Sequence, residues 1–215
     1  MFLDYFSRAR NYLSEQGLKP CIELGERVSE SELAALDLST DMPVPAELRQ
    51  FYLELGDGFR FIPDAAHDSK LTGWEAMHLD DHKIANTGFV GQIEEDALEE
   101  INNPSPRSGP QLLRQEMEKR KRWMPFYGFV GGGDYLCLDL TLSPPPVRFH
   151  DSLCWVAIHQ TWDFILATSL TDFVERCSRY HFPSPSGAWT SFCRGRSGRF
   201  DWAPEHFPKV VAQSR

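Results

Sequence analysis

Two histidines, His78 and His82, lie four residues apart with Asp80 and Asp81 between them. On a helix this spacing can turn two imidazoles toward one metal ion, as in zinc hydrolases that also carry a Glu directly after the first histidine. Here Leu79 occupies that position, and the segment begins as an expected strand. We therefore predict histidines in a loop or at a helix start, and no metal or cofactor, with a two-histidine metal site as the alternative.

A catalytic triad is the second chemistry to consider, because Asp151 directly follows His150 and His159 lies a few residues further on. An imidazole and a carboxylate act in hydrolysis only beside an activated nucleophile. The sequence has no G-x-S-x-G segment, and none of its five scattered cysteines has an evident activating context. We predict no catalytic residues, and keep an enzyme or a small-ligand binder as an alternative.

A glycine triplet, Gly131, Gly132 and Gly133, precedes Asp134. A phosphate-binding loop would continue into Lys-Ser or Lys-Thr and open a helix, whereas this run joins two predicted strands. Glycine permits positive φ and hence a tight reversal, so we predict a structural turn that Asp134 caps. Asp139 is expected to bind backbone amides at the strand end. Five positions apart on a strand, the two carboxylates point to opposite faces and cannot act as an acid pair.

The most acidic stretch of the chain is carried by Glu94, Glu95, Asp96, Glu99 and Glu100. One interpretation is a solvated helix face. The other is a binding surface whose carboxylates pair with Lys and Arg on a basic protein partner, which the net charge of −9 would attract. The same net charge repels phosphate backbones, so we predict no binding to nucleic acid.

Composition places the chain among ordinary globular proteins, with 215 residues, 41% hydrophobic and 25% charged. No stretch approaches the roughly 18 uninterrupted apolar residues of a membrane-spanning helix. The N-terminus lacks the basic and apolar regions of a signal peptide. The odd number of scattered cysteines, without C-x-x-C, indicates free thiols in a reducing compartment. We therefore expect a cytoplasmic protein that does not associate with membranes.

Helix signals gather in the first quarter of the chain and again near residue 170. Apolar residues at three- and four-residue steps predict a helix over residues 2–16 that Gly17 ends. Ser29 and Glu32 form a capping box for a second helix. Pro45 suits the first turn of a third helix, and Gly56 suits a left-handed residue after its end. Ser169 is the expected N-cap of a late helix.

Strand signals lie mainly between the helices. Residues 59–62 and 76–79 are short strand candidates, and 135–140 and 147–150 are predicted strands. Residues 91–122 are expected to hold two exposed, charged helices separated by a loop. Since helices and strands are segregated along the chain instead of alternating, we predict an α+β fold.

Four segments in this order resemble the SUKH superfamily of Smi/Knr-type domains. They are the capped helix start Val28–Leu33, the Pro-containing helix and glycine turn Val44–Gly58 with Gly58 at its end, the glycine-rich strand pair Phe129–Leu140, and the strand-to-helix step Ile165–Val174. Each motif alone is weak, but four in the right order over residues 26–180 form a specific pattern.

The resemblance implies a single α+β domain with a mixed, mostly antiparallel twisted sheet, helices packed around it and no catalytic residues. On this basis we expect an N-terminal helical extension (1–25), the domain itself (26–182) with a charged helical insertion (91–122), and a C-terminal extension that packs on it (183–215). Many bacterial members neutralise secreted toxins, often nucleases, by direct binding, which implies a basic toxin domain as the partner. Other members are regulatory or scaffold interaction proteins, and this remains the alternative function.

Overall fold

The computed structural model describes residues 1–40, 42–64, 74–82, 118–128, 135–150, 164–182 and 200–202, with a few single positions between 90 and 115. It confirms the α+β prediction. The described strands form two sheets instead of one, with orders β1-β2-β3 and β4-β5-β6-β7, and every pairing among them is antiparallel. None of the helices in these ranges is long and apolar enough to cross a membrane.

Among the described elements, helices come before and after the main run of strands. The elements are α1 (Phe2–Glu15), β1 (Cys21–Glu23), α2 (Glu30–Thr40), α3 (Ala46–Leu55), β2 (Arg60–Ile62), β3 (Trp74–Glu75), β4 (Trp123–Gly128), β5 (Tyr135–Asp139), β6 (Val147–His150), β7 (Ile165–Ala167) and α6 (Leu170–Arg179).

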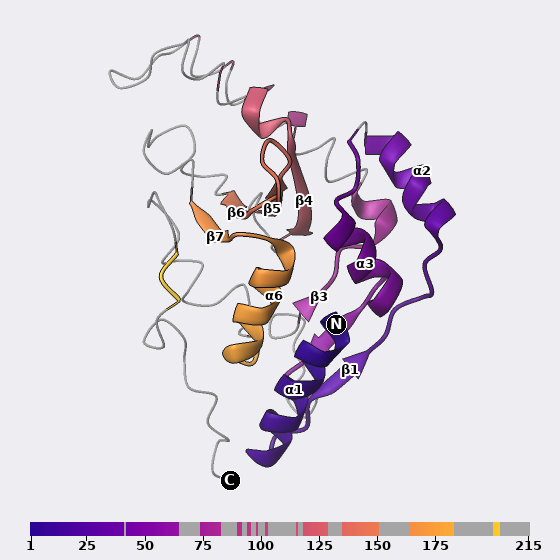
Figure 1. Ribbon diagram of the computed structural model, residues 1–215, viewed down its shortest axis with the longest axis vertical. Coiled ribbons are helices and arrows are strands. Elements are labelled where there is room, and N and C mark those ends of the chain that lie inside the picture. The colour runs from indigo at the N-terminus through magenta and orange to yellow at the C-terminus, as the bar shows by residue number, and fades with distance from the viewer. Residues whose placement is uncertain are drawn as a thin grey trace.

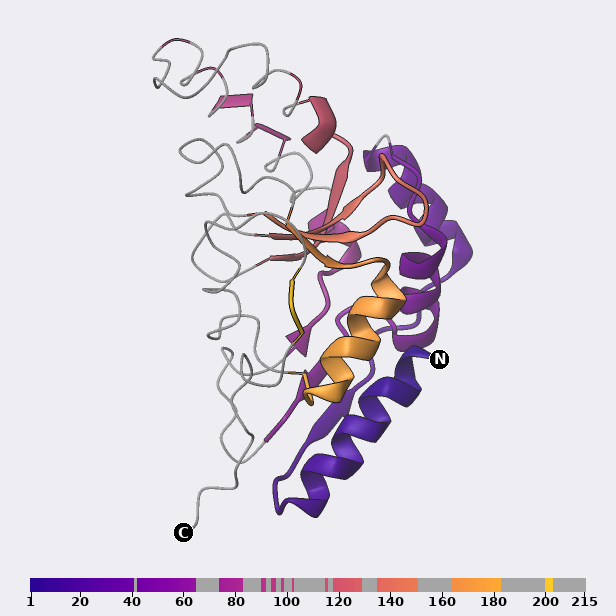
Figure 2. The ribbon, with the colours of Figure 1, turned by 60° about the vertical axis from the view of Figure 1, so that its left-hand side comes forward.

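The helices gather on one side of the four-stranded sheet, where α1 packs against α3 and α6 (Figures 1 and 2). Each helix buries one stripe of apolar residues, as its three- and four-residue spacing predicts. In α1 the buried stripe is Phe2, Phe6, Ala9 and Leu13, and in α6 it is Leu170, Phe173, Val174 and Cys177. These stripes belong to one apolar cluster with the helix-facing side of the sheet.

The helix ends follow their local sequence. The Ser29 N–H donates to the Glu32 carboxylate at 2.7 Å, and the Glu32 N–H lies 3.4 Å from the Ser29 hydroxyl, which together form a capping box. The Ser169 hydroxyl accepts from the Asp172 N–H at the start of α6. Pro45 is the N-cap of α3 instead of a first-turn residue, and its carbonyl accepts from the Arg49 N–H.

Two glycines fix the chain after α3. Gly56 has φ of +88° and lies so close to Gly25 that an added Cβ would meet the Gly25 carbonyl oxygen at 2.5 Å. Gly58 has φ of +77°, and a Cβ there would meet the His78 ring. Both positions therefore favour glycine for its positive φ, and Gly56 also requires it for space against the Gly25 backbone. The glycine turn predicted before β5, with Gly132, Gly133 and Asp134, lies outside the described residues.

The prediction of a strand at residues 76–79 is wrong. The strand lies just before it, at Trp74–Glu75, and pairs with β2. Residues 76–78 leave the sheet, after which residues 79–82 turn into a short helix. The chain departs there because the Tyr52 hydroxyl donates to the Met77 carbonyl and Asp57 accepts from the Leu79 N–H, so these groups are satisfied outside a ladder.

Candidate functional site

The structure does not bring the two spaced histidines to one point. His78 is exposed, with Nδ1 3.3 Å from the Asp57 carboxylate. His82 is 1% exposed, and its Nε2 lies 2.5 Å from the Tyr52 hydroxyl. Burial lowers the pKa of His82 to about 4, against the opposing effect of the Pro125 carbonyl. Within the described ranges no group of three His, Cys, Asp or Glu side chains could hold a metal ion.

His150, the histidine of the considered triad, is fully buried on β6. Arg120 Nη1 lies 2.7 Å from its Nδ1, so the imidazole accepts a hydrogen bond and is neutral. Burial, and then the Arg120 charge, hold the pKa of His150 well below its usual value. An imidazole without solvent access that is already bonded to a cation is unsuited to general-base work. Asp151 and His159 lie outside the described residues.

Arg120 corrects the expectation that the charged helices of residues 91–122 are exposed throughout, because it is only 2% exposed. It belongs to a charged cluster on the sheet face that points away from the apolar cluster. On that face Arg148 Nε donates to the Asp139 carboxylate at 2.7 Å, with both side chains buried. The guanidinium carbons of Arg120 and Arg148 lie 4.7 and 5.4 Å from the Trp123 ring.

Strand alternation explains this charged face. In β6, Val147 and Phe149 belong to the apolar cluster, so Arg148 and His150 point to the opposite face. The alternation of Val-Arg-Phe-His is visible in the sequence, and it could have placed Arg148 on the face opposite the apolar residues. As predicted, Asp139 also accepts from the Thr141 N–H at 3.0 Å where β5 ends.

The described cysteines offer no nucleophile on this face or in the helices. Cys137 and Cys177 are free thiols and fully buried. Burial raises the pKa of Cys137 and of Cys177, so both remain protonated thiols near neutral pH. A thiol in that state is a poor nucleophile.

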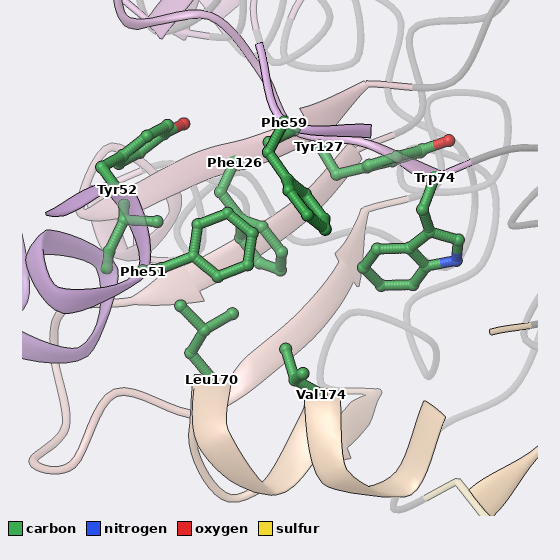
Figure 3. Close-up of a pocket in the computed structure, with 10 residues that line it drawn as sticks. Phe51, Tyr52, Phe59, Trp74, Phe126, Tyr127, Leu170 and Val174 are labelled. Atoms are coloured by element: carbon green, nitrogen blue, oxygen red, sulfur yellow. The ribbon is translucent and has the colours of Figure 1, made fainter. Parts of the chain in front are cut away.

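An aromatic cavity lies between α3, α6 and the sheets (Figure 3). Its volume is about 20 Å³, little more than the roughly 10–15 Å³ that one water needs. Figure 3 shows the side chains of Phe51, Phe59, Phe126 and Trp74 converging on it. Most of these rings are nearly fully buried. The cavity is therefore a gap in the core and too small for a substrate.

A larger hollow, which we term the proline groove, opens on the surface with a volume of about 400 Å³. It is formed by the start of α3, by Arg122 before β4 and by the turn between β5 and β6. Its lining residues are Pro43, Val44, Pro45, Ala46, Glu47, Arg122, Leu140, Ser143, Pro144 and Pro145. Local sequence patterns do not predict this groove, because its prolines meet only in the tertiary fold.

The acidic stretch is described only in part. Glu94 and Glu95 are exposed and helical. The Glu94 carboxylate lies 3.0 Å from Lys121 Nζ, which also pairs with Glu118 at 3.1 Å. Asp96, Glu99 and Glu100 lie outside the described residues. The ion pair between Glu94 and Lys121 places one end of the acidic stretch close to Arg122, which lines the proline groove.

Comparison with known protein families agrees with this fold. Residues 27–176 match the SMI1 / KNR4 family (SUKH-1), which is more than half of the chain. No curated protein and no solved structure matches the chain significantly.

Proposed function

Because the chain belongs to the SMI1 / KNR4 family (SUKH-1), we propose that it is a non-catalytic protein-binding module that neutralises a secreted toxin by direct binding. The observation that carries the proposal is where its reactive side chains lie. His82 and His150 are buried and bonded to Tyr52 and Arg120, while the acidic residues Glu94 and Glu95 are exposed. These two imidazoles are kept from solvent, while the exposed carboxylates can contact a partner.

The partner that this charge favours is a basic toxin domain, such as a nuclease whose active cleft binds phosphates. The proposed contact surface is the acidic stretch of Glu94, Glu95, Asp96, Glu99 and Glu100. With a net charge of −9 the chain would attract such a partner and speed its association. Neutralisation of a toxin inside the cell would require a cytoplasmic protein, and the free cysteines Cys21, Cys137 and Cys177 are compatible with that compartment.

Co-expression is the direct test. The candidate toxins are the C-terminal domains of large secreted proteins encoded beside this chain's gene. Each candidate domain is expressed with and without the full chain. We expect one domain to be toxic alone and tolerated with the chain, and to form a complex in calorimetry. If no such domain is bound or tolerated, the proposed function is wrong.

Charge reversal tests the surface. Glu94→Lys with Glu95→Lys is expected to weaken a basic toxin domain by about tenfold or more and to flatten the salt dependence of binding. The matched control is Glu15→Lys with Glu26→Lys, which changes the net charge equally at exposed positions elsewhere. Equal weakening by both pairs would show that only net charge matters. Unchanged affinity in the Glu94 and Glu95 variant would remove this surface from the proposal.

A further inference from the structure

The proline groove lies between segments that are far apart in the sequence. Residues 43–47 connect α2 to α3, and residues 140–145 form the turn between β5 and β6. Figure 2 shows that turn reaching toward α2 and α3 on the helix side of the sheet. The volume of about 400 Å³ is in the range of sites that hold a small molecule or a large side chain.

The groove walls are apolar and held in place. Four of the ten lining residues are prolines, which fix φ and carry no N–H. The Val44 N–H donates to the Asp37 carboxylate at 2.6 Å, and the Leu140 N–H donates to the Arg122 carbonyl at 3.0 Å. With four prolines and these two backbone amides already bonded, the walls offer mainly apolar contact. A rigid wall also loses little conformational entropy on binding.

One positive charge stands at this apolar surface. Arg122 is exposed, and within the described ranges its side chain forms no ion pair. The other charged lining residue, Glu47, already accepts from the Thr171 N–H at 3.2 Å. The groove therefore presents proline rings and aliphatic side chains, with the Glu47 carboxylate bonded to the start of α6 and the Arg122 guanidinium carrying unused donors. Its complement is an apolar group that carries or adjoins a carboxylate.

We propose that the proline groove is a docking site into which the partner protein inserts an aromatic side chain, with a neighbouring carboxylate paired to Arg122. This inference rests on the proposed function, since it names chemistry of the same partner. Flat rings pack well against proline faces, and aromatic anchors in pockets carry most of the energy at many interfaces. A nucleic acid is disfavoured, because one cation in an apolar groove cannot follow a row of phosphates.

The position of the groove joins it to the acidic stretch. Lys121, bonded to Glu94, is the residue directly before Arg122. A partner that contacts Glu94 and Glu95 therefore has the groove within the span of a standard interface of roughly 800 Å² on each side. The acidic stretch would attract basic residues and set the rate of association, and the groove would receive the anchor.

The groove chemistry is tested first without the partner. The probe is N-acetyltryptophan, which combines an aromatic ring with a carboxylate, and the control ligand is its carboxamide. Backbone amide shifts of the full chain are followed by NMR during titration. We expect shifts at Val44, Ala46 and Leu140, with the acid bound about three- to tenfold more tightly than the amide. In Arg122→Gln the two ligands should bind equally, while Arg10→Gln, an exposed site on α1, keeps the difference.

A groove-filling variant then tests the partner. Ala46 lines the groove and is exposed, so Ala46→Trp fills it without disturbing the core, and Ala34→Trp at an exposed site on α2 is the control. With the toxin domain identified by co-expression, Ala46→Trp is expected to weaken binding at least about tenfold and the control to leave it unchanged. Absence of groove shifts, or full toxin affinity in Ala46→Trp, overturns this inference. A wild-type chain that binds no toxin domain but binds N-acetyltryptophan in the groove overturns the proposed function instead.

Discussion

Loss of Asp139 is expected to destabilise the protein strongly, because it would leave Arg148 charged and buried. Arg148 is 4% exposed and Asp139 is fully buried, with 2.7 Å between Nε and the carboxylate. Removing one partner of a buried ion pair costs about 3–5 kcal/mol. The Trp123 ring near Arg148 does not offset this cost, because the same contact is already present in the wild-type protein. A domain of this kind has a free energy of unfolding of roughly 5–15 kcal/mol. Asp139→Ala should therefore remove a large part of that free energy.

The assay is urea unfolding at pH 7, monitored by tryptophan fluorescence and by far-UV circular dichroism. An apolar replacement of the pair, Asp139→Leu with Arg148→Met, should recover most of the loss, because the variant leaves neither charge of the pair in the core. The control is Glu175→Ala, which removes an exposed pair with Arg179 and should cost less than about 1 kcal/mol. The reasoning is refuted if Asp139→Ala costs no more than this control. It is also refuted if the apolar double variant is no more stable than the single one.

Four further predictions concern His82, Gly56, Ser169 and the span of the family match. The folded-state pKa of His82, about 4, lies below its unfolded value of about 6.5, so its contribution is present above pH 6.5 and lost as the pH falls toward 4. Urea unfolding at pH 7 and pH 4 should show a loss near 3 kcal/mol from this group, which His82→Gln removes. Gly56→Ala should cost several kcal/mol in the same assay, whereas Gly91→Ala, with open space at its Cβ, should be near neutral. Ser169→Ala should cost about 1 kcal/mol through loss of the α6 cap, measurable as a lower thermal midpoint. A chain trimmed to residues 27–176 should show no cooperative unfolding by calorimetry.

The sequence predicts the elements of this fold better than it predicts the site. The apolar stripes of α1 and α6 and the Ser169 cap can be predicted because each depends only on residues a few positions apart in the sequence. Strand β5 is apolar at nearly every position, and it is buried accordingly. By contrast, burial of Arg120 depends on His150, thirty residues away, and no local rule identifies that partner. The proline groove likewise arises only when residues 43–47 meet residues 140–145.

The aromatic core shows why residues outside the family match matter to the domain. Phe6 of α1 is fully buried and stacks on Phe182 with 4.1 Å between ring centroids, and it lies 4.6 Å from Phe59. Of these three rings only Phe59 falls within residues 27–176. Deletion of one buried phenylalanine side chain costs about 3–5 kcal/mol, and the matched span lacks two from this contact alone. Because that loss is comparable to the whole stability of a domain, α1 and the residues after α6 have to be present wherever binding by the proline groove or the acidic stretch is measured.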